Sequence, residues 1–256
     1  MKIELSVVIP CYNEEQNIRL GALDKVVRYL EKQSYKWEMI IVDDGSKDES
    51  VSLIKEFIIQ NSSIKLIESF HQGKAGTVVR GMLSAQGAVI LFTDLDQATP
   101  VDQLEKLFPW VHNGFDVVIG SRKGIRKGAP LFRRVMGPGF MFVRNLILGL
   151  GVIQDTQCGF KLFTRKSSRD IFSRLRIFSN QKEISGPRVT AGFDVEVLFI
   201  GIKLGYKIKE VAVDWHYVDT RRVSPLMDSL DALIDIVKIR IKDLRKEYES
   251  KVQNNE

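Results

Sequence analysis

The chain has 256 residues, of which 44% are hydrophobic, and this is enough for one domain with a sizeable core. Its formal net charge of +6 suits an anionic partner, without choosing between nucleic acid, an anionic membrane and a phosphorylated ligand. Two distant cysteines, Cys11 and Cys158, and three scattered histidines exclude a disulfide framework and a zinc site. The start "MKIELSVVIP" lacks a signal-peptide pattern, and no run reaches the roughly 20 apolar residues that span a bilayer. We therefore expect a reducing, cytoplasmic compartment.

Strands alternate with helices along the first half of the chain. Strands are predicted at 5–10, 37–46, 64–69, 88–94 and 116–122, and helices at 15–32, 47–60 and 73–87, the last closed by Gly87. Apolar runs such as Val89 to Phe92 are typical of strands buried on both faces, which belong to parallel sheets. The alternation predicts an α/β fold with a doubly wound, mostly parallel sheet, whose ligand site lies at the carboxyl ends of the strands.

From about Ala129 the pattern changes. The segment 131–153 is strongly apolar, but arginines, glycines and a proline interrupt it, so we expect it to be amphipathic or buried. The segment 226–248 predicts an amphipathic helix with basic neighbours, which either packs on the core or, as the charges favour, lies at a membrane interface. Its stripe consists of Leu226, Leu230, Leu233, Val237, Ile241, Leu244 and Tyr248. We divide the chain into a main domain at 1–225, this helix, and a disordered tail at 249–256.

Two aspartates, Asp94 and Asp96, flank one residue where a predicted strand ends. Such a pair can share a hard divalent cation, Mg²⁺ or Mn²⁺, whose coordination substrate phosphates commonly complete, so a diphosphate is the natural ligand. In the alternative interpretation one aspartate caps the following turn and the other is solvated. Further charged residues at the ends of predicted strands and at the start of a predicted helix favour the metal site. The strand ends carry Asp43, Asp44 and Arg122, and the helix start carries Lys74. Neither a Walker A motif nor a G-x-G-x-x-G after the first strand is present.

The motifs resemble those of family-2 glycosyltransferases of the GT-A fold. They occur in the family's order as "SVVIPCYNEE", "IIVDDGSKDES", "GKAGTVVRGM", "FTDLDQAT", "VVIGSR", "DTQCGFKLF", "GFDVEVLFI" and "VDWHYVDTRRVSP". The chain looks most like the dolichyl- or polyprenyl-phosphate glucosyltransferases, with the polyprenyl-phosphate mannosyltransferases as relatives. The resemblance runs from about Ile3 to Leu244.

The resemblance implies roles for particular residues. Residues that match the family's nucleoside-binding positions are Pro10, Tyr12, Glu14 and Asp44. Asp94 and Asp96 match the metal and diphosphate motif, and Arg122 and Arg133 match basic residues near the sugar and the acceptor phosphate. Gln97 follows Asp96 directly, which leaves its role as a metal ligand open.

Chemistry suggests further candidates. Lys74 and Arg222 are candidate helpers for the leaving diphosphate. Asp194 or Glu196 of "FDVE" orients the acceptor side or binds sugar hydroxyls, although capping or ion pairing is an equal alternative. The histidines and Cys158 are interpreted as packing or surface residues.

These inferences predict an inverting, metal-dependent glycosyltransferase. It would move a hexose, glucose from UDP-glucose, to a polyprenyl or dolichyl phosphate as a peripheral enzyme at the cytoplasmic face of a membrane. Another nucleotide sugar such as GDP-mannose, or a soluble acceptor, is the alternative. A catalytically silent nucleotide-sugar or membrane-binding module is the non-enzyme alternative, against which the intact Asp94 and Asp96 argue. Nucleic-acid binding has the least support, because the basic residues accompany apolar stripes rather than exposed aromatic side chains.

Overall fold

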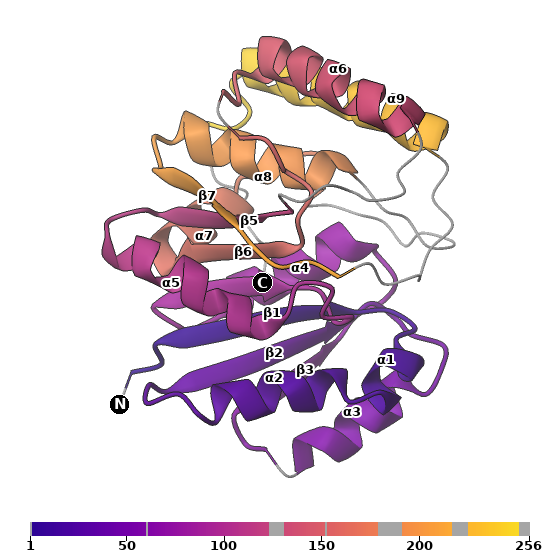
Figure 1. Ribbon diagram of the computed structural model, residues 1–256, viewed down its shortest axis with the longest axis vertical. Coiled ribbons are helices and arrows are strands. Elements are labelled where there is room, and N and C mark those ends of the chain that lie inside the picture. The colour runs from indigo at the N-terminus through magenta and orange to yellow at the C-terminus, as the bar shows by residue number, and fades with distance from the viewer. Residues whose placement is uncertain are drawn as a thin grey trace.

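The computed structural model describes residues 2–59, 61–122, 131–151, 153–178, 191–216 and 225–250, with the backbone alone at 131–138, 140, 191 and 225–230. A seven-stranded sheet in the order β3-β2-β1-β4-β6-β5-β7 forms its centre (Figure 1). The strands are β1 (Leu5–Cys11), β2 (Trp37–Asp43), β3 (Ile64–Glu68), β4 (Val89–Thr93), β5 (Val117–Ser121), β6 (Phe160–Thr164) and β7 (Ile208–Ala212). Every neighbouring pair is parallel except those of β6, which runs antiparallel to β4 and β5.

The helices cover both faces of this sheet. They are α1 (Glu15–Arg19), α2 (Ala22–Leu30), α3 (Ser50–Ile59), α4 (Lys74–Ser84), α5 (Leu104–His112), α6 (Leu131–Leu148), α7 (Arg165–Phe172), α8 (Ala191–Lys203) and α9 (Pro225–Leu244), with a 3₁₀ turn at Val101–Gln103. The predicted alternation and the mostly parallel sheet are therefore confirmed. The insertion of antiparallel β6 between β4 and β5 was not predicted.

Two helix predictions need correction, and each correction concerns a glycine. The predicted helix 15–32 is divided into α1 and α2, because Gly21 between them has a φ of 76°, in the left-handed region that favours glycine. The predicted helix 73–87 ends at Ser84, so Gly87 is not its cap. Gly87 instead donates its N–H to Ser6 Oγ, and a Cβ there would lie 2.5 Å from the Ser6 nitrogen. A close backbone approach therefore requires this glycine.

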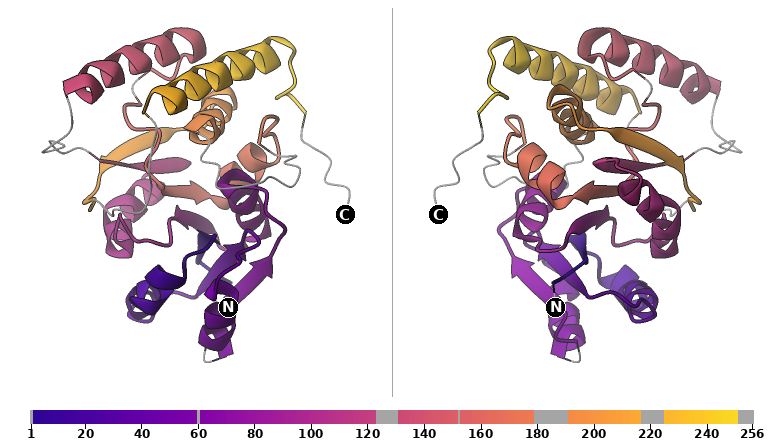
Figure 2. Two further views of the ribbon diagram at one scale, coloured as in Figure 1. Left: turned by 90° about the vertical axis from the view of Figure 1, so that its right-hand side faces the viewer. Right: turned by 90° about the vertical axis from the view of Figure 1, so that its left-hand side faces the viewer.

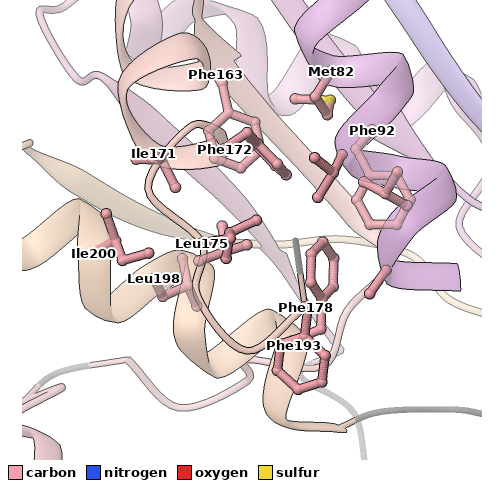
Figure 3. Packing of buried hydrophobic residues seen from close by; sticks show 14 of the residues in the cluster. Met82, Phe92, Phe163, Ile171, Phe172, Leu175, Phe178, Phe193, Leu198 and Ile200 are labelled. Carbon is pink, nitrogen blue, oxygen red and sulfur yellow. The ribbon is translucent and has the colours of Figure 1, made fainter. Parts of the chain in front are cut away.

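The strands bury side chains on both faces, as their apolar runs predicted. One face packs under α2 and α5, and the other packs under α4, α7 and α8. Figure 3 shows the second face, where Phe163 meets Phe172 edge to face with ring centroids 5.4 Å apart. Phe178 meets Phe193 of α8 in the same way at 6.0 Å. These contacts fix α8 on the sheet beside the carboxyl ends of the strands.

Helices α6 and α9 lie side by side outside α8 (Figures 1 and 2). The inner face of α9 buries Ala232, Ile236 and Ile239. Of the predicted C-terminal stripe, Tyr248 is buried, whereas the members that α9 leaves exposed are Leu233, Val237, Ile241 and Leu244. The described helices include none whose length and apolar character are sufficient for crossing a membrane.

Candidate active site

The carboxyl ends of β1, β2, β4 and β5 meet at one edge of the sheet, and a cavity of about 170 Å³ opens beside the last two. It brings Asp94, Asp96 and Arg122 together. The other lining residues are Thr93, Ala98, Thr99, Gln157, Gly159 and Trp215. The sequence prediction that these three charged residues share a site therefore agrees with their positions.

Asp94 follows directly after β4. Its Oδ1 pairs with the Lys74 Nζ at 2.5 Å, and Lys74 is the first residue of α4. On the other side the carboxylate lies against Gly159, where an added Cβ would be 2.0 Å from Asp94 Oδ2. Only a glycine leaves room for this carboxylate.

Asp96 and Gln97 complete the turn after β4. The Asp96 Oδ1 accepts the N–H of Ala98 at 3.0 Å, so the alternative capping role is present for this aspartate. Gln97 has a φ of 52°, which is uncommon outside glycine and marks strain of the kind found at functional sites. Its Nε2 donates to the Asp94 carbonyl, and its buried Oε1 has no hydrogen-bond partner.

This turn suits a hard divalent cation. Asp94 and Asp96 offer carboxylate oxygens, and the orphaned Gln97 Oε1 is an oxygen that a cation or a water can satisfy. Among the described residues, no group of three or more His, Cys, Asp or Glu side chains could hold a metal ion. A Mg²⁺ or Mn²⁺ ion with one or two carboxylates normally takes further oxygens from substrate phosphates, so the donor set fits.

Arg122 is held by a partner that the sequence prediction missed, Asp155 of "DTQCGFKLF". Its Nε and Nη2 donate to the two oxygens of Asp155 at 2.8 Å each, and its backbone N–H donates to Oδ2. Burial alone would raise the pKa of Asp155, but the hydrogen bonds and charge of Arg122 outweigh it and lower the pKa to about 2. The Trp215 ring lies 5.7 Å from the guanidinium. Nη1 is the nitrogen that Asp155 leaves for other partners.

The ends of β1 and β2 carry the residues predicted for the nucleoside. The Asp43 Oδ2 accepts the N–H groups of Gly45 and Ser46, which shapes the turn after β2. Asp44 is buried, and its carboxylate accepts from His71 Nδ1 at 2.7 Å and from the N–H groups of Gln72 and Gly73. Asp44 therefore ties the end of β2 to the loop that opens α4.

The His71 ring stacks on Tyr12 with centroids 4.2 Å apart and an interplanar angle of 9°. Sequence reasoning had interpreted His71 as an ordinary surface or packing residue, and no motif spacing identified it. Pro10 lies in β1. Glu14 occupies the N-cap position of α1 without a capping hydrogen bond from its side chain, and its Oε2 accepts from the side-chain amide of Asn17. Tyr12, Asp44 and His71 form one connected cluster, which Asp44 joins to Gly73, the residue before Lys74.

The two acidic residues of "FDVE" differ in position. Asp194 Oδ1 pairs at 2.5 Å with the buried Lys161 of β6, so its ion-pairing alternative is present. Glu196 is fully buried away from the cavity, where its Oε1 accepts from Tyr248 and from the N–H groups of Arg176 and Ile177. Burial raises the pKa of Glu196 to about 7. The proposed acceptor or sugar role of Glu196 is thus wrong, because its carboxylate faces the core.

Two basic candidates remain predictions. Arg133 belongs to α6, whose backbone alone is described at that position, and Arg222 lies outside the described residues. Residues 179–190, which precede the "GFDVE" motif, also lie outside the described residues.

Fold and site together define an enzyme of the glycosyltransferase class, with paired aspartates at the carboxyl ends of a mostly parallel sheet. The family model described as glycosyl transferase family 2 matches residues 6–172, and the chain belongs to this family. It is 36% identical over 261 residues to the dolichyl-phosphate beta-glucosyltransferase of Dictyostelium discoideum, covering 94% of this chain and 75% of that protein. It is 34% identical over 262 residues to the human protein of the same name, covering 94% and 76%. The family resemblance is confirmed.

Solved structures share the fold. Glucosyl-3-phosphoglycerate synthase from Mycobacterium tuberculosis, in complex with Mn²⁺, UDP and glucosyl-3-phosphoglycerate, has a TM-score of 0.63 at 18% identity, covering 93% of this chain and 80% of that one. A mannosyltransferase from Pyrobaculum calidifontis, in complex with GDP-Man and Mn²⁺, has a TM-score of 0.60 at 19% identity, covering 95% and 65%. At these identities the likeness supports the fold and carries no substrate over to this chain.

Proposed function

We propose that this enzyme transfers glucose from UDP-glucose to a dolichyl or other polyprenyl phosphate, with inversion at the anomeric carbon. The observation that carries the proposal is the cavity in which Asp94 and Asp96 face the cationic Arg122. It occurs in a chain that is 34–36% identical to proteins named dolichyl-phosphate beta-glucosyltransferase. The cavity offers a diphosphate side and a phosphate side next to each other.

On the donor side, Asp94 and Asp96 would hold Mg²⁺ or Mn²⁺, and the buried Gln97 Oε1 is a further oxygen of the same turn. When bound, this cation would neutralise charge that develops on the departing nucleoside diphosphate. Lys74 and Arg222 are proposed to assist at the diphosphate. The proposed nucleoside end consists of Pro10, Tyr12, Glu14, Asp43 and Asp44, supported by the link from Asp44 through His71 to Tyr12.

On the acceptor side, Arg122 and Arg133 are proposed to orient the lipid phosphate. Asp155 already binds two nitrogens of Arg122, so the guanidinium would present Nη1 rather than its whole fork. A phosphate monoester has a second pKa near 6 and is largely ionised at neutral pH, so it can attack without a strong base. The side chain of Asp194 is 17% exposed, and we propose that its carboxylate accepts a hydrogen bond from a hydroxyl of the sugar or orients the acceptor substrate.

We also propose that the enzyme works at a membrane surface, on the cytoplasmic face, because a polyprenyl acceptor stays in the bilayer. Helices α6 and α9 each expose an apolar stripe, which we call the exposed stripes: Phe142 and Leu146 on α6, and Leu233, Ile234, Val237, Ile241 and Leu244 on α9. Exposed contiguous apolar side chains are typical of lipid or protein interfaces.

The basic residues of α9 support binding to anionic lipids less than the sequence suggested. Of the basic residues on α9, Lys238 pairs with Asp235, Arg240 with Asp243, and Lys242 with Glu247 at the helix end. Because these acids offset the bases, we expect apolar insertion rather than attraction to anionic lipids to provide most of the binding.

A panel of substrates tests the proposal. The purified chain is incubated with UDP-glucose or GDP-mannose, with Mn²⁺ or Mg²⁺, and with a short polyprenyl phosphate or 3-phosphoglycerate, and products are detected by mass. We expect a hexosyl polyprenyl phosphate from UDP-glucose that disappears with EDTA and in Asp96→Asn. A product from 3-phosphoglycerate alone would show a soluble acceptor instead, and a product from GDP-mannose alone would show another donor.

A further inference from the structure

A buried lysine, Lys161, lies behind the candidate active site, and the proposed chemistry does not use it. It belongs to β6 and pairs in register with Phe92 of β4, two residues before Asp94. Its side chain is 2% exposed. Burial of an ammonium group is costly unless it is paired and hydrogen-bonded, and an apolar residue of similar volume is often as stable. Packing alone therefore does not account for a charged residue here.

The Lys161 ammonium group joins three parts of the fold. Its Nζ donates to the Cys158 carbonyl at 2.5 Å and to the Asp194 Oδ1 at 2.5 Å, and it lies 5.9 Å from the centre of the Phe92 ring. Asp194 is in the first turn of α8. One side chain thus connects the turn before β6, strand β4 and the start of α8, and its three N–H groups have acceptors or a ring face nearby.

The Cys158 carbonyl is adjacent to the turn after β4 that carries Asp94, Asp96 and Gln97. It belongs to the peptide unit that links Cys158 to Gly159, and the Asp94 carboxylate rests on Gly159. A Cβ at Gly159 would lie 2.6 Å from the Asp94 Cγ, so a small rotation of this peptide would push the carboxylate. Lys74 holds the opposite oxygen at 2.5 Å. The orientation of Asp94 therefore depends on how firmly the Cys158–Gly159 peptide is held.

We propose that Lys161 is a positioning residue that holds the Cys158–Gly159 peptide and thereby orients the Asp94 carboxylate for a divalent cation. This inference rests on the proposed function, which assigns a cation to Asp94. Groups that hold a metal ligand in place typically contribute about 10- to 100-fold to metal affinity. We expect an effect of this size from Lys161, although it does not touch the cation or the substrates.

Mn²⁺ affinity tests the proposal. The full chain with saturating UDP is titrated with Mn²⁺ by calorimetry, and Lys161→Met is compared with the unmodified protein. Lys161→Met leaves the Asp194 carboxylate without its cationic partner, which can prevent folding. The double variant Lys161→Met/Asp194→Asn removes both charges and replaces the single variant if that one does not fold. We expect Mn²⁺ to bind about 10- to 100-fold more weakly to both variants.

Three further variants sharpen the comparison. Asp194→Asn alone keeps the ammonium group on the Cys158 carbonyl, so it should weaken Mn²⁺ binding less than Lys161→Met does. Gly159→Ala displaces Asp94 directly and should weaken Mn²⁺ binding as Lys161→Met does. Lys203→Met removes a lysine that pairs with Asp243 on α9, and should leave Mn²⁺ binding unchanged.

The outcomes separate this inference from the proposed function. A folded Lys161→Met/Asp194→Asn variant with unchanged Mn²⁺ affinity overturns the positioning role and leaves the proposed function in place. A lower melting temperature with unchanged Mn²⁺ affinity has the same meaning, because it indicates a structural role only. Failure of the unmodified protein with UDP to bind Mn²⁺ contradicts the proposed metal dependence and overturns this inference with it.

Discussion

Replacing Asp155 by Asn tests the electrostatics of Arg122, the arginine that lines the cavity with Asp94 and Asp96. The pKa of this carboxyl falls from its ordinary 3.8 to about 2, and its side chain is 15% exposed. At 1.36 kcal/mol per pKa unit, this depression makes the ionised form worth about 2 kcal/mol of folding free energy. Because the folded pKa is the lower one, this stability is present above pH 4 and is lost as the pH falls towards 2. We therefore expect Asp155→Asn to unfold more easily by about 2 kcal/mol at pH 7.

Urea denaturation at several pH values measures this difference. The gap between the two proteins should narrow to about half by pH 3, since the carboxyl of the unfolded wild type is then mostly protonated while that of the folded protein is still largely ionised. The KM for the acceptor should also rise, because Arg122 loses its orienting partner. Asp214→Asn is the matched control, as its pair with Lys106 is exposed, and its stability should match the wild type. A gap that does not change with pH would refute this reasoning.

Three other substitutions have defined outcomes. Asp96→Asn should keep the fold and abolish metal-dependent turnover at saturating donor, so near-normal turnover would contradict its role as a metal ligand. The raised pKa of Glu196, about 7, makes ionisation of this carboxyl unfavourable in the folded protein, so the unfolding free energy of the wild type should fall by on the order of 3 kcal/mol between pH 4.5 and 7. Glu196→Gln should remove this fall. Polar substitution of the exposed stripes should reduce sedimentation with liposomes more than neutralising the α9 lysines and arginines does, with UDP affinity as the control; the stripe residues to change are Phe142, Leu146, Val237, Ile241 and Leu244.

The sheet was predictable because its strands are short apolar runs that end in polar residues. Such runs identify strands buried on both faces, and their order along the chain fixes the parallel β-α-β units. Strand β6 was not predicted, since Lys161 interrupts its apolar pattern and nothing local marks an antiparallel direction. Its position between β4 and β5 depends on long-range pairing, which periodicity does not record.

The charged residues of the cavity were predictable from strand ends, but their partners were not. Asp94, Asp96 and Arg122 follow strands directly, so topology alone brings them to one edge of the sheet. Asp155 and Lys161 pair with residues 33 positions away in each case, and a single sequence offers no signal for such a pairing. His71 was missed because its role depends on stacking with Tyr12 across two loops.

The same partners bear on which acceptor the cavity suits. Asp94, Asp155 and Asp194 each lie within 2.8 Å of a nitrogen of Lys74, Arg122 or Lys161. A general base for a hydroxyl acceptor works best with a pKa near neutral pH, whereas the hydrogen bonds and charge of Arg122 lower the pKa of Asp155 to about 2. Within the described part of the chain, the carboxylates that line the cavity are Asp94, which pairs with Lys74, and Asp96, which we propose as a metal ligand. An acceptor that is already ionised, such as a phosphate monoester, needs none of them as a base. The arrangement of charges therefore favours a phosphate acceptor over an alcohol, independently of the names of related proteins.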